Sequence, residues 1–215
     1  MRIAIVGPDG AGKTSVANQL QQLLPQSKVV YAGKSHNHHL FITKWTYQFW
    51  QWTKKLRMPI LYQLVRFFLF YPVEYIENLA RFQRVKDKKI IIYDRHPIDR
   101  MIMIYEYLSK YPDSAKFFNT QYFLLRWCNW WYRVFFPKIE QIYCLLPEPA
   151  LCWQRSGGHY LNPAEAQWKI DAYRQAVIQL VQRQPVSIIE ITPELTINEI
   201  AQQILVSLEN DHKNN

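Results

Sequence analysis

The stretch Gly7-Pro-Asp-Gly-Ala-Gly-Lys-Thr14 constrains this chain most, because it matches the pattern G-x-x-x-x-G-K-[ST] in full. An apolar, β-branched run over 2–6 precedes it and predicts a buried strand, while residues 13–24 follow with leucine and valine at helical spacing. In such a loop the backbone N–H groups and the helix N-terminus bind phosphate oxygens. Lys13 reaches the β- and γ-phosphates, and Thr14 is a ligand for Mg²⁺. The residues expected to contact a bound nucleotide are Gly7, Asp9, Gly10, Ala11, Gly12, Lys13, Thr14 and Ser15.

A second buried strand, predicted over 89–94, ends in an acid that is followed by a base. The strand has no polar face, as is typical of a parallel sheet covered on both sides. Asp94 at its end is therefore a candidate Mg²⁺ ligand, directly or through water, and the same residue type is a common helix N-cap. The two roles are compatible. Arg95 comes next, and its guanidinium can bind a phosphate through two hydrogen bonds.

Strands and helices alternate along the chain, which predicts an α/β protein with a parallel sheet. The strands are expected over 2–6, 28–32, 89–94, 141–146 and 186–191. Residues 40–85 are expected to be mainly helical, and further helices are expected over 99–110, 114–135, 148–156, 163–182 and 196–209. Together these elements predict a three-layer P-loop NTPase fold: a five-stranded parallel sheet flanked by helices, with a lid. We expect a single domain over 1–210, with the lid at about 148–165 and a loose tail over 211–215.

Composition places the chain among globular proteins, since 49% of its residues are hydrophobic and 20% are charged. We expect no signal peptide, because Arg2 is followed at once by a short strand-like run and glycines. We expect no membrane-spanning helix, because the longest apolar run is interrupted by Gln63 and Arg66. The cysteines at 128, 144 and 152 form no C-x-x-C pair, so disulfides are not expected and a reducing cytoplasm is the default location.

The net charge of +9 is unevenly distributed. Residues 1–73 contain nine lysines and arginines and a single acid, Asp9, which gives this third of the chain a charge of +8. A basic region of this kind attracts nucleotide phosphates, nucleic acid or an anionic membrane. For the cluster Lys54–Arg57, a merely solvated basic face is the alternative interpretation.

The phosphate loop "GPDGAGKTS", together with Asp94-Arg-His96 after a buried strand, resembles the thymidylate kinase family of nucleoside-monophosphate kinases. The resemblance extends over most of the chain, in pieces, and implies ATP and Mg²⁺ as cofactors. It implies that Asp9 touches the acceptor sugar, that Arg95 holds phosphate at the transfer site and that Lys34 binds the acceptor phosphate. The segment that begins "PEPALCWQRSGG" resembles the family's lid. Because Gly10 stands where some members have a P-loop arginine, Arg155 becomes the candidate transition-state arginine.

The expected acceptor pocket departs from the family pattern. A gapless count back from Asp94 places Phe70 where the family stacks an aromatic ring on thymine, and it places Glu74 where the family reads the base with arginine. After the Asp-Arg-His motif, Asp99 begins a stretch that replaces the small polar residues contacting thymine. The acceptor is thus expected to be dTMP, a base with an amino group that donates to an acid, or a compound other than a nucleotide.

Two alternatives to a nucleoside-monophosphate acceptor stay open at this stage. A hydroxyl acceptor, as in nucleoside or sugar kinases, needs a general base. Deoxynucleoside kinases place a glutamate after the second strand; here that stretch is "GKSHNHH", in which His36 is the candidate base, with Asp9 elsewhere. A non-catalytic nucleotide-binding module is the other alternative, whereas a GTPase is disfavoured because no N-K-x-D motif is present. The histidines at 36, 38 and 39 also permit a metal site, although they lack a matching distant set of ligands.

Two segments, 41–52 and 117–138, are unusually rich in aromatic residues. They are expected to form core and a helical dimer interface, since thymidylate kinases are typically homodimers. The alternative is an interfacial surface for a membrane or a lipid-linked substrate, which tryptophan and tyrosine with interspersed arginine also suit. Nucleic acid is not expected as a partner, because no known nucleic-acid-binding motif accompanies the rings. The sequence therefore predicts a cytoplasmic, homodimeric P-loop kinase of nucleotide biosynthesis that transfers phosphate from MgATP to a small phosphorylated acceptor.

Overall fold

The computed structural model describes residues 1–31, 41–56, 61, 64–74, 76–77, 85, 89–96, 99, 102, 127, 130, 138–181 and 185–213. The chain divides into two compact units. Unit 1 comprises Met1–Gly33, Asp87–Ile102 and Lys138–Asn215, and unit 2 comprises Lys34–Lys86 and Met103–Pro137. This division was not predicted from the sequence. The helices expected over 99–110 and 114–135 fall almost entirely outside the described residues.

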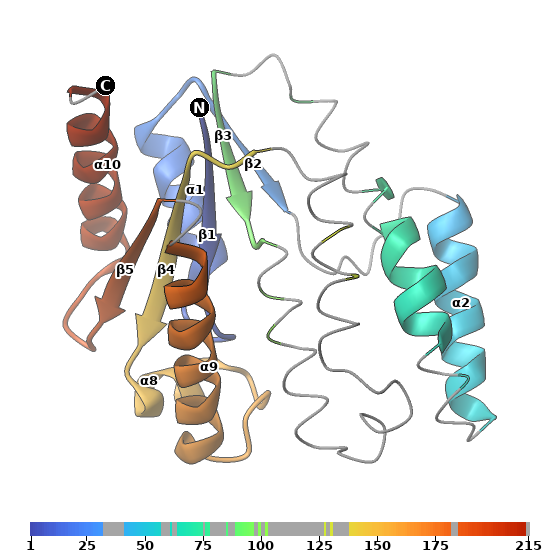
Figure 1. Cartoon of the computed structure of the whole chain (residues 1–215). Coiled ribbons are helices and arrows are strands. Elements are labelled where there is room, and N and C mark those ends of the chain that lie inside the picture. The colour runs from blue at the N-terminus through green and yellow to red at the C-terminus, as the bar shows by residue number, and fades with distance from the viewer. Residues whose placement is uncertain are drawn as a thin grey trace. The chain divides into compact units, whose positions relative to one another are not determined.

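Unit 1 contains a five-stranded, all-parallel sheet with the strand order β2-β3-β1-β4-β5 (Figure 1). The strands are β1 (Arg2–Val6), β2 (Ser27–Tyr31), β3 (Ile90–Asp94), β4 (Gln141–Pro147) and β5 (Val186–Ile191). The central strand β1 places Ile5 opposite Asp94 of β3 and Val6 opposite Cys144 of β4. Because the strands are parallel, the segments that follow β1, β3, β4 and β5 all begin at the same edge of the sheet. The predicted fold class is confirmed.

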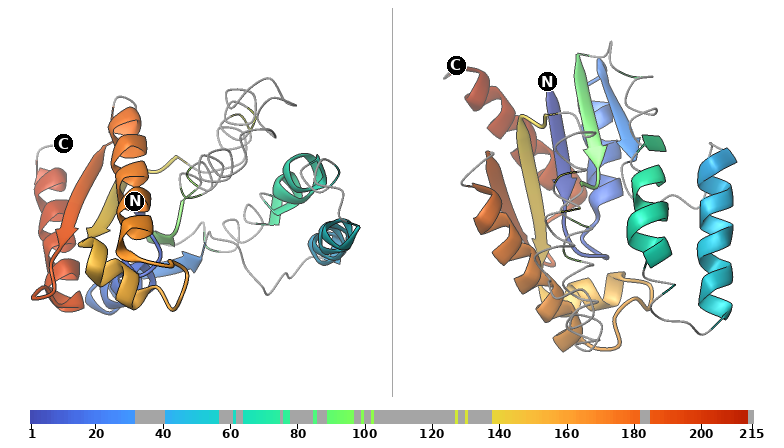
Figure 2. Two further views of the ribbon diagram at one scale, coloured as in Figure 1. Left: turned by 90° about the horizontal axis from the view of Figure 1, so that it is seen from below. Right: turned by 45° about the vertical axis from the view of Figure 1, so that its right-hand side comes forward.

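Helices cover both faces of this sheet (Figure 2). On one face α1 (Lys13–Leu23) packs against α10 (Ile197–Lys213), and on the other α8 (Pro149–Arg155) packs against α9 (Pro163–Val181), which in turn contacts β4 and β5. The three-layer arrangement agrees with the prediction. α10 continues through 211–213, a stretch that was predicted to belong to a loose tail, because the helix has no terminating glycine or proline before its end.

The period-two alternation of the strands divides the apolar residues of unit 1 between the two faces. Ile3 and Ile5 of β1, with Ile92 of β3 beside them, pack against Val16 and Leu20 of α1. Residues of α10 complete the same cluster, namely Ile200, Ala201, Ile204 and Leu208. These side chains are essentially buried, so the helix that begins at the phosphate loop is fixed firmly to the sheet.

Unit 2 contains the helix α2 (Phe41–Lys55), which packs against the element η1 (Val65–Phe70). η1 is a π-helical stretch within a longer helical segment, so the expected helicity is present but its wider turns were not predicted. Phe70 is fully buried and stacks on Trp50 with the ring centroids 5.1 Å apart. Within the described residues, none of the helices combines the length and the apolar character that crossing a bilayer requires.

Candidate active site

The loop between β1 and α1 is shaped by glycines in conformations that other residues rarely adopt. Gly10 and Gly12 have φ angles of 88° and 77°, and Gly12 directly precedes the first residue of α1. Gly7 lies so close to β4 that a Cβ atom there would be 2.4 Å from the carbonyl oxygen of Leu145. The loop is therefore held tightly against the neighbouring strand, with the N-terminus of α1 at its end.

Lys13 is the first residue of α1, and its ammonium group is enclosed by the loop. Its Nζ donates to the carbonyl oxygens of Gly7 at 2.7 Å and Pro8 at 2.6 Å, and only 5% of the residue is exposed. The carboxylate of Asp9 lies 4.0 Å from Nζ. Burial lowers the pKa of Lys13, and the nearby acids oppose that shift without cancelling it. The result is a compact cation positioned at the phosphate loop.

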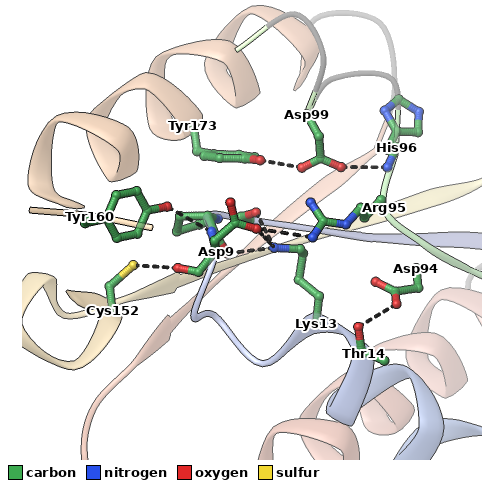
Figure 3. Close-up of polar contacts among 12 residues, drawn as sticks. Asp9, Lys13, Thr14, Asp94, Arg95, His96, Asp99, Cys152, Tyr160 and Tyr173 are labelled. Carbon is green, nitrogen blue, oxygen red and sulfur yellow. Dashed lines mark hydrogen bonds and ion pairs between the residues drawn. The ribbon is translucent and has the colours of Figure 1, made fainter. Parts of the chain in front are cut away.

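Asp94 and Thr14 meet at the end of β3, where the sequence predicted a Mg²⁺ site. Thr14 Oγ1 donates to Asp94 Oδ2 at 2.7 Å (Figure 3). The other carboxylate oxygen, Oδ1, is buried and has no hydrogen-bond partner among the described residues. Burial raises the pKa of Asp94, against the opposing effect of the Thr14 hydrogen bond. A hard divalent cation prefers oxygen ligands of this kind, so these two residues fit Mg²⁺.

Arg95 follows β3 with a φ of 83°, which is uncommon for a residue other than glycine. Its backbone N–H donates to the carbonyl oxygen of Ile5 at 3.0 Å, which anchors the turn to the central strand. Its Nη2 lies 3.2 Å from Asp9 Oδ1, and the guanidinium lies over the Tyr31 ring. Backbone strain of this kind is frequent at functional sites, where surrounding contacts hold it in place.

Asp9 connects the phosphate loop to the segment predicted to be the lid. Its backbone N–H donates to Tyr160 Oη at 2.9 Å, and its carbonyl oxygen accepts from Cys152 Sγ at 3.1 Å (Figure 3). Burial raises the pKa of its carboxyl, but the positive charges of Lys13 and Arg95 lower that pKa by more. The side chain is thus held as an anion between two cations. Sequence reasoning missed Tyr160 and Cys152, and no local signal could have revealed them.

Asp99 is committed to a buried hydrogen-bond network behind Arg95. Its Oδ2 accepts from the His96 backbone N–H at 2.8 Å, and its Oδ1 accepts from the Tyr173 hydroxyl at 2.5 Å. Complete burial lowers the pKa of His96 to about 3. In this structure the Asp99 carboxylate supports the turn that carries Arg95. Both of its oxygens accept hydrogen bonds within the protein, so it is not a free carboxylate for contact with the nucleobase of an acceptor.

The phosphate loop and Arg95 border a cavity of about 560 Å³. Its walls contain the loop residues from Asp9 to Ser15, together with Arg95 and Arg155. The connection between β5 and α10, together with the start of α10, supplies a further, mainly apolar wall. It is formed by Pro193, Leu195, Thr196, Ile197 and Ile200. Sequence reasoning missed this last wall, although its position after a parallel strand at the loop-bearing edge was an available signal.

Three of the residues predicted to bind the acceptor are not tested by the described structure. Lys34 lies outside the described residues, as do the histidines at 36, 38 and 39. Phe70 and Glu74 belong to unit 2, where both are buried and Phe70 packs against Trp50 and Tyr47. Their proposed contacts with an acceptor stay predictions.

Comparison with known proteins identifies the class of fold. Deoxyadenosine kinase from M. mycoides, with the products dCMP and dCDP bound, has a TM-score of 0.57 and 15% identity over 98% of this chain and 100% of that one. Thymidylate kinase from Candida albicans has a TM-score of 0.58 and 14% identity over 98% of this chain and 92% of that one. Thymidylate kinase from Ehrlichia chaffeensis has a TM-score of 0.57 and 14% identity over 97% of this chain and 98% of that one. No protein-family model and no curated protein sequence matches the chain.

The chain therefore has a P-loop kinase fold. More narrowly, its architecture is thymidylate kinase-like, and it is shared with a deoxynucleoside kinase at equal similarity.

Proposed function

We propose that this chain is an ATP-dependent phosphotransferase that resembles thymidylate kinase and transfers the γ-phosphoryl group of ATP to a nucleoside monophosphate, dTMP or a related acceptor. The observation that carries the proposal is the convergence of Lys13, Arg95 and Thr14 at one cavity, with Asp94 hydrogen-bonded to Thr14. Phosphoryl transfer needs little covalent help from the protein, and catalysis consists mainly of positioning and charge neutralisation. The cavity supplies both.

The proposal gives each residue of the site a role. Lys13 and Arg95 would stabilise the charge of the transferring phosphoryl group, and Arg155 would close over it from the lid. Thr14 and Asp94 would hold Mg²⁺. When bound, that ion neutralises charge on the donor phosphates. The apolar wall between β5 and α10 fits the flat base of the nucleotide donor.

The state of Asp9 favours a phosphorylated acceptor over a hydroxyl. A hydroxyl acceptor needs a base that takes up its proton. Asp9 has a lowered pKa because Lys13 and Arg95 surround it, which makes it a weak base, and the proposal assigns Asp94 to Mg²⁺. A phosphate monoester arrives ionised and needs no such base. The alternative acceptor is the hydroxyl group of a nucleoside, a sugar or a lipid-linked substrate. The observation that supports this alternative is the fold that the chain shares with deoxyadenosine kinase.

The test is release of ADP from MgATP in the presence of nucleoside monophosphates, nucleosides and phosphosugars. Lys13→Ala is the inactivating variant, and Lys28→Ala, at an exposed position on β2, is the matched control. Turnover with dTMP supports dTMP as the acceptor, and turnover with another nucleoside monophosphate indicates a changed acceptor pocket. Turnover with a nucleoside alone overturns the proposed acceptor class. Tight ATP binding, measured by calorimetry, without turnover on any acceptor supports a non-catalytic binding module.

The assembly and location follow from the same proposal. A cytoplasmic homodimer engaged in nucleotide biosynthesis is what the resemblance to thymidylate kinases implies. Size-exclusion chromatography with light scattering tests the oligomeric state, and a monomer at micromolar concentration would contradict the dimer.

A further inference from the structure

The helix α2 has its apolar and polar faces in an unusual arrangement. Its buried side contains Trp50 and the three threonines Thr43, Thr46 and Thr53. The hydroxyls of Thr46 and Thr53 donate to carbonyl oxygens of their own helix, at 3.0 Å and 2.7 Å. Most of the large apolar side chains of α2 lie on the outer side.

The exposed side of α2 forms what we call the aromatic face. Its members are Phe41, Ile42, Trp45, the half-buried Phe49 and Trp52, with Leu56 directly after the helix. At 3.6 residues per turn these six positions fall within an arc of about 100° and extend along the helix length of roughly 22 Å. Phe41 is 83% exposed, Trp45 52% and Trp52 53%.

The rings of the aromatic face are ordered against one another. Phe49 stacks on Trp45 with centroids 5.7 Å apart and on Trp52 with centroids 5.8 Å apart. The stack therefore continues over about two turns of one helix surface. An exposed apolar patch of this extent marks an interaction site more often than an ordinary solvated surface.

The charges beside the aromatic face indicate the kind of partner. Lys44 and Lys55 are exposed and border the arc on one side, and α2 contains no aspartate or glutamate. The whole sequence from 34 to 73 has six basic residues and no acid. A second copy of this face would bring more lysines and no acid to pair with them, so self-association would depend on the rings alone. An anionic bilayer surface accepts the rings at the headgroup level and neutralises the lysines.

We propose that the aromatic face of α2 binds the surface of an anionic lipid bilayer. Tryptophan and phenylalanine lie in the interface plane, and the lysines contact the lipid headgroups. This docking is independent of the proposed kinase reaction, because it uses residues of unit 2 that are absent from the phosphate loop and its cavity.

The first experiment is co-sedimentation of the full chain with two kinds of vesicle: pure phosphatidylcholine, and equal parts phosphatidylcholine and phosphatidylglycerol. We expect binding to the second kind that is at least about tenfold tighter and that weakens at high salt. The variant Trp45→Gln with Trp52→Gln is expected to lose about tenfold or more in affinity for the anionic vesicles. Lys44→Gln with Lys55→Gln is expected to reduce the salt dependence.

The matched control is Trp168→Gln, which removes an exposed tryptophan of α9 in unit 1 and is expected to bind as the wild type does. Because the substituted side chains are exposed, each variant is expected to fold, and circular dichroism checks this. Equal binding by the wild type and the double tryptophan variant overturns the proposal, as does equal affinity for the two kinds of vesicle. A wild-type dimer in light scattering that the tryptophan variant dissociates, without vesicle binding by either, also overturns it and assigns the face to self-association.

Discussion

The buried imidazole of His96 makes the stability of this protein depend on pH in a way that can be worked out. Only 3% of His96 is exposed, and burial lowers its pKa from 6.5 to about 3. In the unfolded chain the imidazole takes up a proton as the pH falls through 6.5, whereas in the folded chain it stays neutral down to about pH 3. The unfolded state then binds more protons, so acid favours unfolding over this whole window.

The magnitude follows from the two pKa values. At pH 7.5 both states are almost entirely neutral at this residue, and its effect on the free energy of unfolding is negligible. At pH 5 the unfolded imidazole is nearly fully protonated, and RT ln(1 + 10^1.5) gives a loss of about 2 kcal/mol. Any folded-state pKa below about 4 gives nearly the same loss, so the result depends on burial rather than on the particular value.

Urea unfolding followed by tryptophan fluorescence at pH 7.5 and pH 5 measures this loss. The wild type is expected to lose about 2 kcal/mol more than His96→Gln between the two pH values, because glutamine has no proton to gain. His159→Gln, the same substitution at an exposed histidine, is the control and should retain the wild-type loss. An equal loss in the wild type and His96→Gln would refute the reasoning.

Three further predictions concern the loop, the buried network and the metal site. Gly10→Ala and Gly158→Ala both place alanine at a φ near 85–88°, which costs about 1 kcal/mol of stability. At Gly10 the new Cβ would in addition lie 2.5 Å from a carbonyl oxygen of α8, whereas at Gly158 it would meet open space. Thermal unfolding should therefore show the Gly10 variant less stable by a further 1–3 kcal/mol or so, and equal stabilities would contradict the close packing. Tyr173→Phe is expected to cost about 1–3 kcal/mol in urea unfolding, because Asp99 Oδ1 loses its buried donor; an unchanged midpoint would show that the contact adds nothing. Asp94→Asn keeps an acceptor for the Thr14 hydroxyl but removes the negative charge. We expect kcat for ADP release, measured in a Mg²⁺ titration, to fall about a hundredfold. An unchanged dependence of the rate on Mg²⁺ concentration would exclude a role of Asp94 in metal binding.

The sheet was predictable from the sequence because its inner strands are buried on both faces. The run Arg2–Val6 has no inward-facing polar residue, and the run Ile90–Asp94 ends at its first acid, so each strand starts and ends within a residue of its predicted bounds. The pairing of Thr14 with Asp94 followed from the same logic, because the ends of parallel strands meet at one edge. The strand order itself is not encoded in any local pattern.

What the sequence could not predict depends on contacts between distant residues. Tyr160 and Cys152 reach Asp9 across 151 and 143 positions, and Tyr173 reaches Asp99 across 74. A tyrosine on an amphipathic helix has no signature that distinguishes a core residue from a hydrogen-bond donor to a distant carboxylate. The division into two units was missed for a related reason, since unit 2 is assembled from two separate segments of the chain.

The support of the phosphate loop by Cys152 and Tyr160 has a consequence for how the protein is made. The loop motif ends at Thr14, but the strand beside Gly7 begins only at Gln141, and the two groups that hold Asp9 come later still. These contacts form only after Tyr160 has been synthesised, and contacts between such distant residues are slow to form in folding. During translation, the nascent chain therefore carries the loop motif before the residues that hold the loop in its folded shape exist.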